Sequence, residues 1–206
     1  VAEGTVFHGE TGAPLPGSTV VLTDGTDKEL ARTVVGADGN YRFPLQKDSD
    51  YRLMVEKEGF FKQSARITTR GRTEPVLRTD FKLFPLVVDQ VVRLENIFYD
   101  YNKWNIRPDA AIELDKLVQT LLDNPTVTIE LSSHTDCRGK DAYNMSLSQK
   151  RAKAAVDYLI VEGIAADRVK SKGYGEAKPS ETCVCEKCSE DQHQRNRRTE
   201  FKVLSK

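Results

Sequence analysis

The sequence predicts two domains, an all-β sandwich followed by an α+β domain. Three observations support this prediction. Residues 1–70 contain short β-branched and aromatic runs separated by Gly-containing turns, which is typical of a small β-sandwich. Residues 71–86 are interrupted by glycine and proline, as expected for a linker. Residues 87–206 alternate between strand-like and helix-like apolar spacing, which indicates an α+β domain.

In the first domain, the predicted strands are short and end at turns. They cover residues 19–23, 41–45 and 51–56, and Asp-Gly, Asp-Gly-Asn and Glu-Gly sequences lie beside them. Such sequences favour the positive backbone angles that tight turns need. The linker at 71–86 also holds apolar residues that can pack on a domain. We therefore expect it to be short and partly ordered.

The second domain is organised around residues 127–163. Alternating apolar residues at 127–131 predict a half-buried strand. Polar residues and a glycine at 133–139 predict a loop at the end of that strand. From about Asp141 the apolar spacing becomes helical, and the helix is expected to end before Gly163.

One face of this helix is expected to lie opposite the preceding loop. Asn144, Leu147, Ser148 and Arg151 have the spacing of a single helical face, and Asp136 lies in the loop. A carboxylate and a guanidinium held apart can bind a zwitterion, because Asp136 can accept an ammonium and Arg151 a carboxylate. Asn144 offers amide groups to orient such a ligand. The spacing equally allows Asp136 to pair with Arg151 or to cap the helix.

Further strands and one helix complete the predicted second domain, and the helix carries no visible chemistry. A strand-like run covers residues 87–99, and an apolar helix is expected from Pro108 to the Asn-Pro pair at 124–125. Two further strands are expected near 168–174 and 199–203. Trp104 is expected to be a packing residue or, if exposed, a contact for sugar.

Composition and motifs exclude several classes of function. Lys plus Arg and Asp plus Glu number 31 each, and the charges also balance within each predicted domain, so no nucleic-acid partner is expected. No apolar run is long enough to predict a transmembrane segment. His134 and Asp136 could form an acid/base pair, but the chain lacks a nucleophile elbow, a metal-binding HExxH helix and a phosphate loop. We expect no enzyme activity, cofactor or bound metal. The chain has no initiating Met or signal segment, so a mature product or an excised piece is expected.

Several separate motifs in the second domain resemble one family. In order, the chain reads SHTDCRG, YN, LSQKRA, KGYGE and NRRTEFKV. This order and spacing, over about residues 88–203, resemble the OmpA-like C-terminal domain family, which includes the Pal and MotB periplasmic domains. The resemblance implies a βαβαββ-type domain that binds the diaminopimelate residue of the peptidoglycan stem peptide without covalent chemistry. It places the family's ligand-binding acid, arginine and asparagine at Asp136, Arg151 and Asn144.

The same resemblance extends the expected ligand-binding site. It places a second contribution at Tyr101 and Asn102, whose side chains would line the wall of the cleft. Leu147 completes the expected set on the helix. Arg197 or Arg198 could flank the cleft and meet a second ligand carboxylate, or both could be solvated strand residues.

The first domain resembles the carboxypeptidase regulatory-like domain family. The stretches that carry the resemblance are GTVFHGETGAPLPGSTVVL, GADGNYRF and YRLMVEKEGF. It implies a prealbumin-like β-sandwich with a structural or adhesive role. No catalytic role follows from this resemblance.

Four cysteines, Cys137, Cys183, Cys185 and Cys188, allow two interpretations. Together with His193 they could hold zinc. However, Cys-x-Cys is not the usual spacing of a zinc knuckle, and thiols oxidise in the periplasm, so two disulfides are expected. A Cys183–Cys185 bond is disfavoured by strain, and the other two connectivities stay open. A bridge from Cys137 would order the adjacent acidic loop.

Together these observations predict a non-catalytic cell-wall anchor that binds the peptidoglycan stem peptide. The combination of domains resembles the C-terminal portions of outer-membrane-associated proteins of Bacteroidota, type IX secretion components among them. We expect a periplasmic location, linked to the outer membrane through other parts of the polypeptide or through partners in an envelope or secretion complex. The alternative hypothesis is a protein-interaction module with a vestigial cleft.

Overall fold

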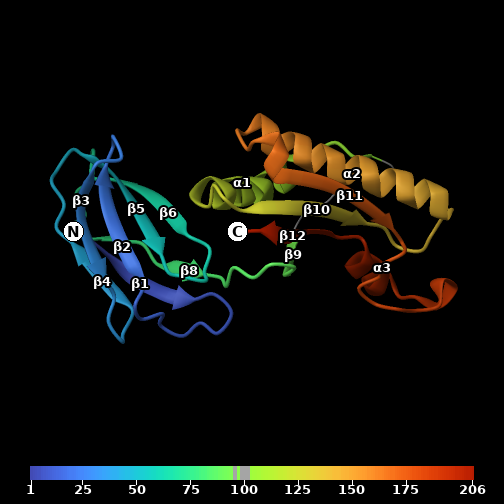
Figure 1. Ribbon diagram of the computed structural model, residues 1–206, viewed down its shortest axis with the longest axis horizontal. Helices are drawn as coiled ribbons and strands as arrows, with labels where there is room; N and C mark the ends of the chain where they lie inside the picture. Colours follow the sequence, from blue (N-terminus) through green and yellow to red (C-terminus); the bar gives the residue numbers. More distant parts are fainter. Residues whose placement is uncertain (95–96, 98–102) are drawn as a thin grey trace. The chain divides into compact units, whose positions relative to one another are not determined.

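The computed structural model describes residues 1–94, 97 and 103–206. The chain divides into two compact units, Val1–Leu86 and Val87–Lys206, whose elements are labelled in Figure 1. The first unit is all-β and the second combines helices with one sheet. This confirms the predicted fold class of each part.

Two sheets make up the first unit. One has the strand order β4-β1-β7, with β8 also paired to β1, and the other has the order β3-β2-β5-β6. The strands are β1 (Ala2–His8), β2 (Thr19–Asp24), β3 (Glu29–Val34), β4 (Asn40–Phe43), β5 (Asp50–Glu56), β6 (Gln63–Thr68), β7 (Leu77–Arg78) and β8 (Phe81–Leu83).

Both sheets contribute to one core, which makes the unit a sandwich. Val6 and Phe43 from the first sheet belong to the same buried cluster as Val20, Leu53 and Val55 from the second. Burial alternates along β5, as the two-residue period of a strand requires when one face is covered. The hydrophobic effect on these alternating side chains therefore holds the two sheets together.

The segment predicted as a linker, residues 71–86, belongs to the first unit. β7 and β8 both pair parallel with β1. Phe81 and Leu83 are buried in the core, and Asp80 Oδ1 accepts the Thr5 N–H at 2.8 Å. The apolar residues that the sequence allowed to pack on one domain thus extend the sandwich to Leu86.

The second unit has a sheet of order β11-β10-β12-β9 with helices on it. Strand β10 is parallel to β11 and antiparallel to β12, which in turn is antiparallel to β9. The elements are β9 (Val91–Leu94), α1 (Pro108–Asp123), β10 (Thr128–His134), α2 (Asp141–Val161), η1 (Ala166–Arg168), β11 (Val169–Gly175), η2 (Cys185–Lys187), α3 (Glu190–Asn196) and β12 (Thr199–Ser205).

Helix α2 lies directly against β11, and this contact requires a glycine. A Cβ atom at Gly173 would lie 2.3 Å from the backbone nitrogen of Gln149, so no larger residue fits without moving backbone. The Gly173 N–H donates to Gln149 Oε1, and the Gly175 N–H donates to Ser148 Oγ, both at 2.8 Å. These contacts set the rotation of α2 relative to the end of β10.

Helix α3 was not predicted. It begins with a capping box, in which Ser189 Oγ accepts the Gln192 N–H and Gln192 accepts the Ser189 N–H. This pattern satisfies two N–H groups that a helix start would otherwise leave unpaired. The Ser-x-x-Gln spacing was the sequence signal that could have predicted the helix.

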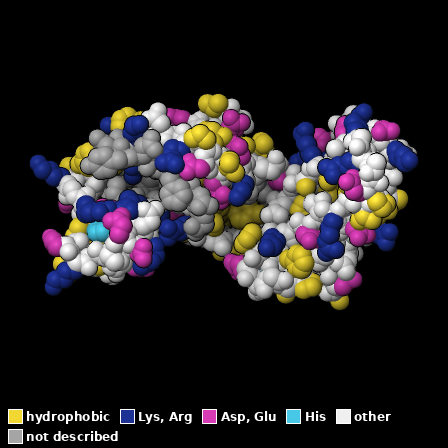
Figure 2. Space-filling view, turned by 180° about the vertical axis from the view of Figure 1, so that it is seen from behind, with side chains coloured by type: hydrophobic (Ala, Val, Ile, Leu, Met, Phe, Trp, Pro, Cys, Tyr) yellow, Lys and Arg dark blue, Asp and Glu magenta, His cyan; other side chains and the backbone are white. Residues whose placement is uncertain are grey.

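Positive and negative side chains are interspersed on the face seen in Figure 2. This distribution agrees with the balanced composition of the chain. Within the described parts of the chain, none of the helices combines the length and apolar character needed to cross a membrane.

Candidate ligand-binding cleft

Hydrogen bonds to backbone groups hold the end of β10 and the loop between β10 and α2 from three sides. The His134 N–H donates to the Arg198 carbonyl, and the Thr135 N–H to the Gly175 carbonyl, both at 2.9 Å. From α2, Asn144 Nδ2 donates to the carbonyls of Asp136 and Arg138 at 3.3 and 3.1 Å. Asn144 therefore has a positioning role in the loop, in addition to lining the cleft.

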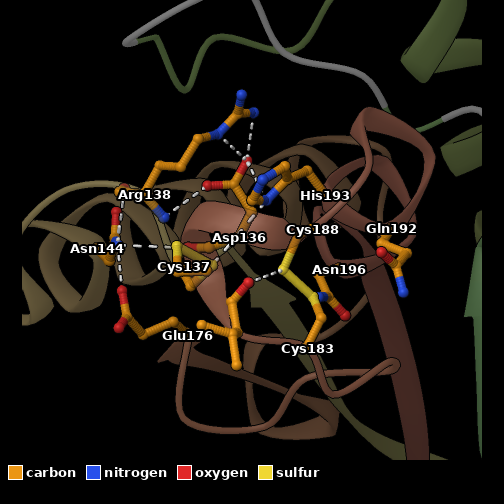
Figure 3. Close-up of a disulfide and its surroundings, with 12 residues drawn as sticks. Asp136, Cys137, Arg138, Asn144, Glu176, Cys183, Cys188, Gln192, His193 and Asn196 are labelled. Carbon is orange, nitrogen blue, oxygen red and sulfur yellow. Dashed lines mark hydrogen bonds and ion pairs between the residues drawn. A yellow bond between two sulfur atoms is a disulfide. The ribbon is translucent and has the colours of Figure 1, made fainter.

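Two disulfide bonds connect the four cysteines, and Figure 3 shows one of them beside the acidic loop. Cys137 pairs with Cys185, and Cys183 pairs with Cys188. Tertiary structure thus selects one of the two connectivities that the sequence left open. The Cys137–Cys185 bond ties the loop to the segment before α3.

The residues of the alternative zinc site do gather in space. The candidate ligand atoms of Cys137, Cys188 and His193 all lie within 4.8 Å of one another. Both sulfur atoms are in disulfides, so they lack the thiolate charge that a zinc ligand supplies. The cluster is therefore better described as two disulfides packed beside His193 than as a metal site.

Asp136 is buried and engaged by two arginines. Its Oδ1 accepts the Arg138 N–H at 3.0 Å, and its Oδ2 accepts Arg138 Nη2 at 2.7 Å and a short hydrogen bond from Arg197 Nη1. Burial raises the pKa of Asp136, but the hydrogen bonds from Arg138 and Arg197 outweigh it and hold the pKa below 3.8. The carboxylate is therefore ionised at neutral pH.

Arg151 lies on the same cleft as Asp136. Its side chain is buried, and its Nε donates to the Lys103 carbonyl at 3.0 Å. The cleft has a volume of about 740 Å³, and its lining includes Asp136, Arg151, Asn144 and Leu147. The structure thus brings together the residues predicted on the loop and on the helix.

The other predicted residues have different outcomes. Arg197 lines the cleft, whereas Arg198 is paired with Glu200 through its Nε and donates Nη2 to the Lys178 carbonyl. Tyr101 and Asn102 lie outside the described residues. Arg198 instead lines a neighbouring cavity, together with Arg151 and Arg197, so a flanking role for either arginine stays a prediction.

Glu190, at the start of α3, is a residue of the cleft that sequence reasoning missed. It accepts Arg138 Nη1 at 3.0 Å and Arg197 Nη2 at 2.7 Å. Hydrogen bonds from Arg197 and Arg138 lower its pKa. Two carboxylates, Asp136 and Glu190, therefore share two arginines, and this network joins the acidic loop to α3.

His134, at the end of β10, is a buried neutral imidazole. Burial and the positive charges of Arg198 and Lys178 lower its pKa to about 3. Its ring stacks on Tyr174 with the centroids 5.3 Å apart. A histidine with this pKa is a weak base, so the acid/base pair that His134 and Asp136 could have formed has no support here.

Comparison with known proteins identifies both units. Residues 98–197 match the model of the OmpA family. This match covers most of the second unit. Residues 2–83 match the model of the carboxypeptidase regulatory-like domain, so both resemblances that the sequence suggested are confirmed.

Individual relatives match part of this chain over part of their own length. Outer membrane porin F of Pseudomonas fluorescens is 35% identical over 117 residues, which are 56% of this chain and 35% of that protein. Outer membrane protein A of Escherichia fergusonii is 37% identical over 93 residues, which are 44% of this chain and 38% of that protein. This chain therefore spans well under half the length of these relatives.

Two solved structures are similar to part of this chain. The peptidoglycan-associated lipoprotein from Burkholderia pseudomallei has 25% identity and a TM-score of 0.47, covering 52% of this chain and 87% of that chain. The cell wall anchor of the T6SS from Pseudomonas aeruginosa has 24% identity and a TM-score of 0.46, covering 56% of this chain and 80% of that chain.

Proposed function

We propose that the OmpA-family domain binds the diaminopimelate residue of the peptidoglycan stem peptide and so anchors an outer-membrane-associated protein to the cell wall. The observation that carries the proposal is that Asp136 and Arg151 line one cleft, on the loop and the helix of a domain that matches the OmpA family. Binding is non-covalent, and no step of catalysis is needed.

The chemistry of the cleft suits a zwitterionic ligand. Asp136 accepts the ammonium of the ligand, and Arg151 binds its carboxylate through charge-assisted hydrogen bonds. Leu147 offers an apolar surface for the methylene chain, and Asn144 holds the loop. Tyr101 and Asn102, which lie outside the described residues, stay predicted ligand contacts, and Arg197 is proposed to flank the cleft.

The proposal extends to location and partners. An OmpA-family domain next to a carboxypeptidase regulatory-like domain fits a periplasmic segment of an outer-membrane-associated protein. The β-sandwich would space the wall-binding domain or dock partners in an envelope complex, with type IX secretion machinery as one proposed setting.

A sedimentation assay with insoluble peptidoglycan sacculi tests the proposed function. We expect Asp136→Asn and Arg151→Gln each to weaken binding about 30-fold or more, because each leaves an unpaired charge, a loss of about 2–5 kcal/mol. Free diaminopimelate should displace the wild-type protein. Lys153→Gln is the matched control, since Lys153 lies on the same helix in an exposed pair with Asp157.

A second candidate is a protein-interaction module with a vestigial cleft. The engagement of Asp136 by Arg138 and Arg197 favours it, because the carboxylate already has partners without a ligand. This candidate gains support if the wild-type protein does not sediment with sacculi, or if the folded Asp136→Asn and Arg151→Gln variants sediment equally well. Circular dichroism and the thermal midpoint verify folding.

A further inference from the structure

We propose that Arg138 is an internal competitor for the ligand ammonium at Asp136, and that it thereby sets the affinity of the cleft and its selectivity for amines. This inference rests on the proposed function. It concerns a residue to which neither the sequence motifs nor the family resemblance gave a role.

The first step is the geometry at the Asp136 carboxylate. Arg138 Nε and Nη2 both donate to Oδ2, at 3.2 and 2.7 Å, and the Arg138 backbone N–H donates to Oδ1. Figure 3 shows the Arg138 side chain folded back so that its guanidinium meets the carboxylate. An ammonium uses the same oxygen lone pairs. Both guanidinium groups donate to Oδ2, so a ligand ammonium that binds this oxygen must displace one of them.

Arg138 is the more easily displaced of the two arginines. Its side chain is 51% exposed, against 28% for Arg197. Arg197 also donates to Glu190 and Gln194, and its bonds to Asp136 and Gln194 are both partly buried, so moving it would break more than one partly buried bond. The side chain of Arg138 can leave while its backbone N–H stays on Asp136 Oδ1.

Glu190 provides the place to which the displaced guanidinium moves. Arg138 Nη1 already donates to Glu190 Oε2 at 3.0 Å, and the Glu190 side chain is 65% exposed. An exposed ion pair of this kind has little net energy, so Arg138 can exchange between Asp136 and Glu190. Ligand binding then selects the arrangement in which Arg138 is on Glu190 alone.

This exchange lowers the apparent affinity for an amine ligand, because only the fraction of molecules in which Arg138 has left Asp136 can bind it. If Arg138 occupies Asp136 in roughly nine molecules out of ten, removing its side chain tightens binding about tenfold. The gain is specific to amines, since a ligand without an ammonium has no need to displace Arg138. A dicarboxylate without amines therefore serves as the discriminating ligand.

The test compares Arg138→Gln with the wild-type full chain by calorimetric titration of two ligands, diaminopimelate and pimelate. We expect Arg138→Gln to bind diaminopimelate about 3- to 30-fold more tightly, with pimelate binding unchanged or weaker. Arg195→Gln is the control, because Arg195 is an exposed arginine of α3 paired with Glu181. Unchanged or weaker binding of diaminopimelate by Arg138→Gln would overturn the proposal.

A double-mutant cycle with Glu190→Gln gives a second, independent result. Removing Glu190 takes away the alternative partner of Arg138, so Glu190→Gln should weaken diaminopimelate binding, and it should do so less when combined with Arg138→Gln. If Glu190→Gln weakens diaminopimelate binding equally in the wild type and in Arg138→Gln, Arg138 does not exchange between Asp136 and Glu190.

The outcomes separate this inference from the proposed function. If the wild type binds diaminopimelate, Arg151→Gln abolishes binding and Arg138→Gln brings no gain, the competitor role of Arg138 is wrong and the wall-binding site stands. If neither the wild type nor Arg138→Gln binds diaminopimelate, the proposed function itself is wrong and the inference falls with it. If Arg138→Gln binds diaminopimelate and the wild type does not, both the proposed function and the competitor role of Arg138 are supported.

Discussion

At Asp136, burial and hydrogen bonding act on the carboxyl pKa in opposite directions. Burial alone would raise it, and the guanidinium groups of Arg138 and Arg197 bring it below 3.8. The same bonds that keep the carboxylate ionised also occupy its Oδ2 atom. The groups that keep Asp136 charged are thus the ones with which the proposed ligand would compete.

His134 leads to a prediction about pH. Its pKa is about 3 in the folded protein against 6.5 for the free side chain. Between these values the unfolded chain binds a proton that the folded chain does not, so stability falls as the pH is lowered from 7. We expect the free energy of unfolding to lose about 2 kcal/mol from this histidine between about pH 7 and pH 5.

Denaturant unfolding at the two pH values, with and without His134→Gln, measures this loss. Trp104 is the single tryptophan of the chain and lies in the second unit, so its fluorescence reports on that unit. The variant should show a flatter pH dependence, and His8→Gln, in the first unit, should behave as the wild type. If the free energy of unfolding depends on pH equally in the wild type and in His134→Gln, His134 is not the group responsible for the loss.

The segment from Cys183 to α3 acts as one structural element of the cleft. The Cys137–Cys185 bond ties it to the acidic loop across 48 residues of sequence. Its helix carries Glu190, which contacts Arg138 and Arg197. The disulfide and the ion pairs of Glu190 thus both connect the segment around α3 to the acidic loop.

Removing each disulfide separately should have unequal effects. Loop-closure entropy predicts a loss of up to about 4 kcal/mol for Cys137→Ser with Cys185→Ser, and of about 2 kcal/mol for Cys183→Ser with Cys188→Ser, whose cysteines are 5 apart. Only the first pair of substitutions should also weaken diaminopimelate binding, because only that bond holds the loop of Asp136. Denaturant unfolding and calorimetry measure the two effects. If Cys183→Ser with Cys188→Ser lowers the free energy of unfolding more than Cys137→Ser with Cys185→Ser, loop length does not govern the stabilisation by the disulfides.

Over the whole molecule, positive and negative charges are balanced in number. The formal net charge is +0, and Figure 2 shows both signs side by side on the face in view. A polyanion would need a basic surface that releases counterions on binding. A zwitterionic ligand exchanges charges in pairs and needs no such surface.

This balance predicts a weak salt dependence of wall binding. Between about 50 and about 300 mM NaCl, we expect the sacculus affinity to change by less than about threefold, since few counterions are released and the ion pairs form in a partly buried cleft. Sedimentation across a salt series measures the slope. A loss of tenfold or more would instead indicate non-specific attraction to wall polyanions.

Local patterns predicted much of the second unit. The strand–loop–helix order around Asp136 and Arg151 was correct, and α1 and α2 begin where Pro108 and Asp141 were expected to start helices. In the first unit, strands β1, β3 and β6 to β8 were not assigned individually. Helix α3 was missed because its seven residues are too few for an apolar period.

The sequence by itself determined the two fold classes, the OmpA-family motifs, and which loop and helix would face one another. It could do so because periodicity and turn chemistry act over a few residues. Only tertiary structure decided that Arg197 engages Asp136, that Cys137 pairs with Cys185, and that Glu190 joins the cleft. Arg197 and Cys185 are 61 and 48 residues from their partners. Such distant contacts depend on how the sheet, loop and α3 pack together, and no local pattern specifies them.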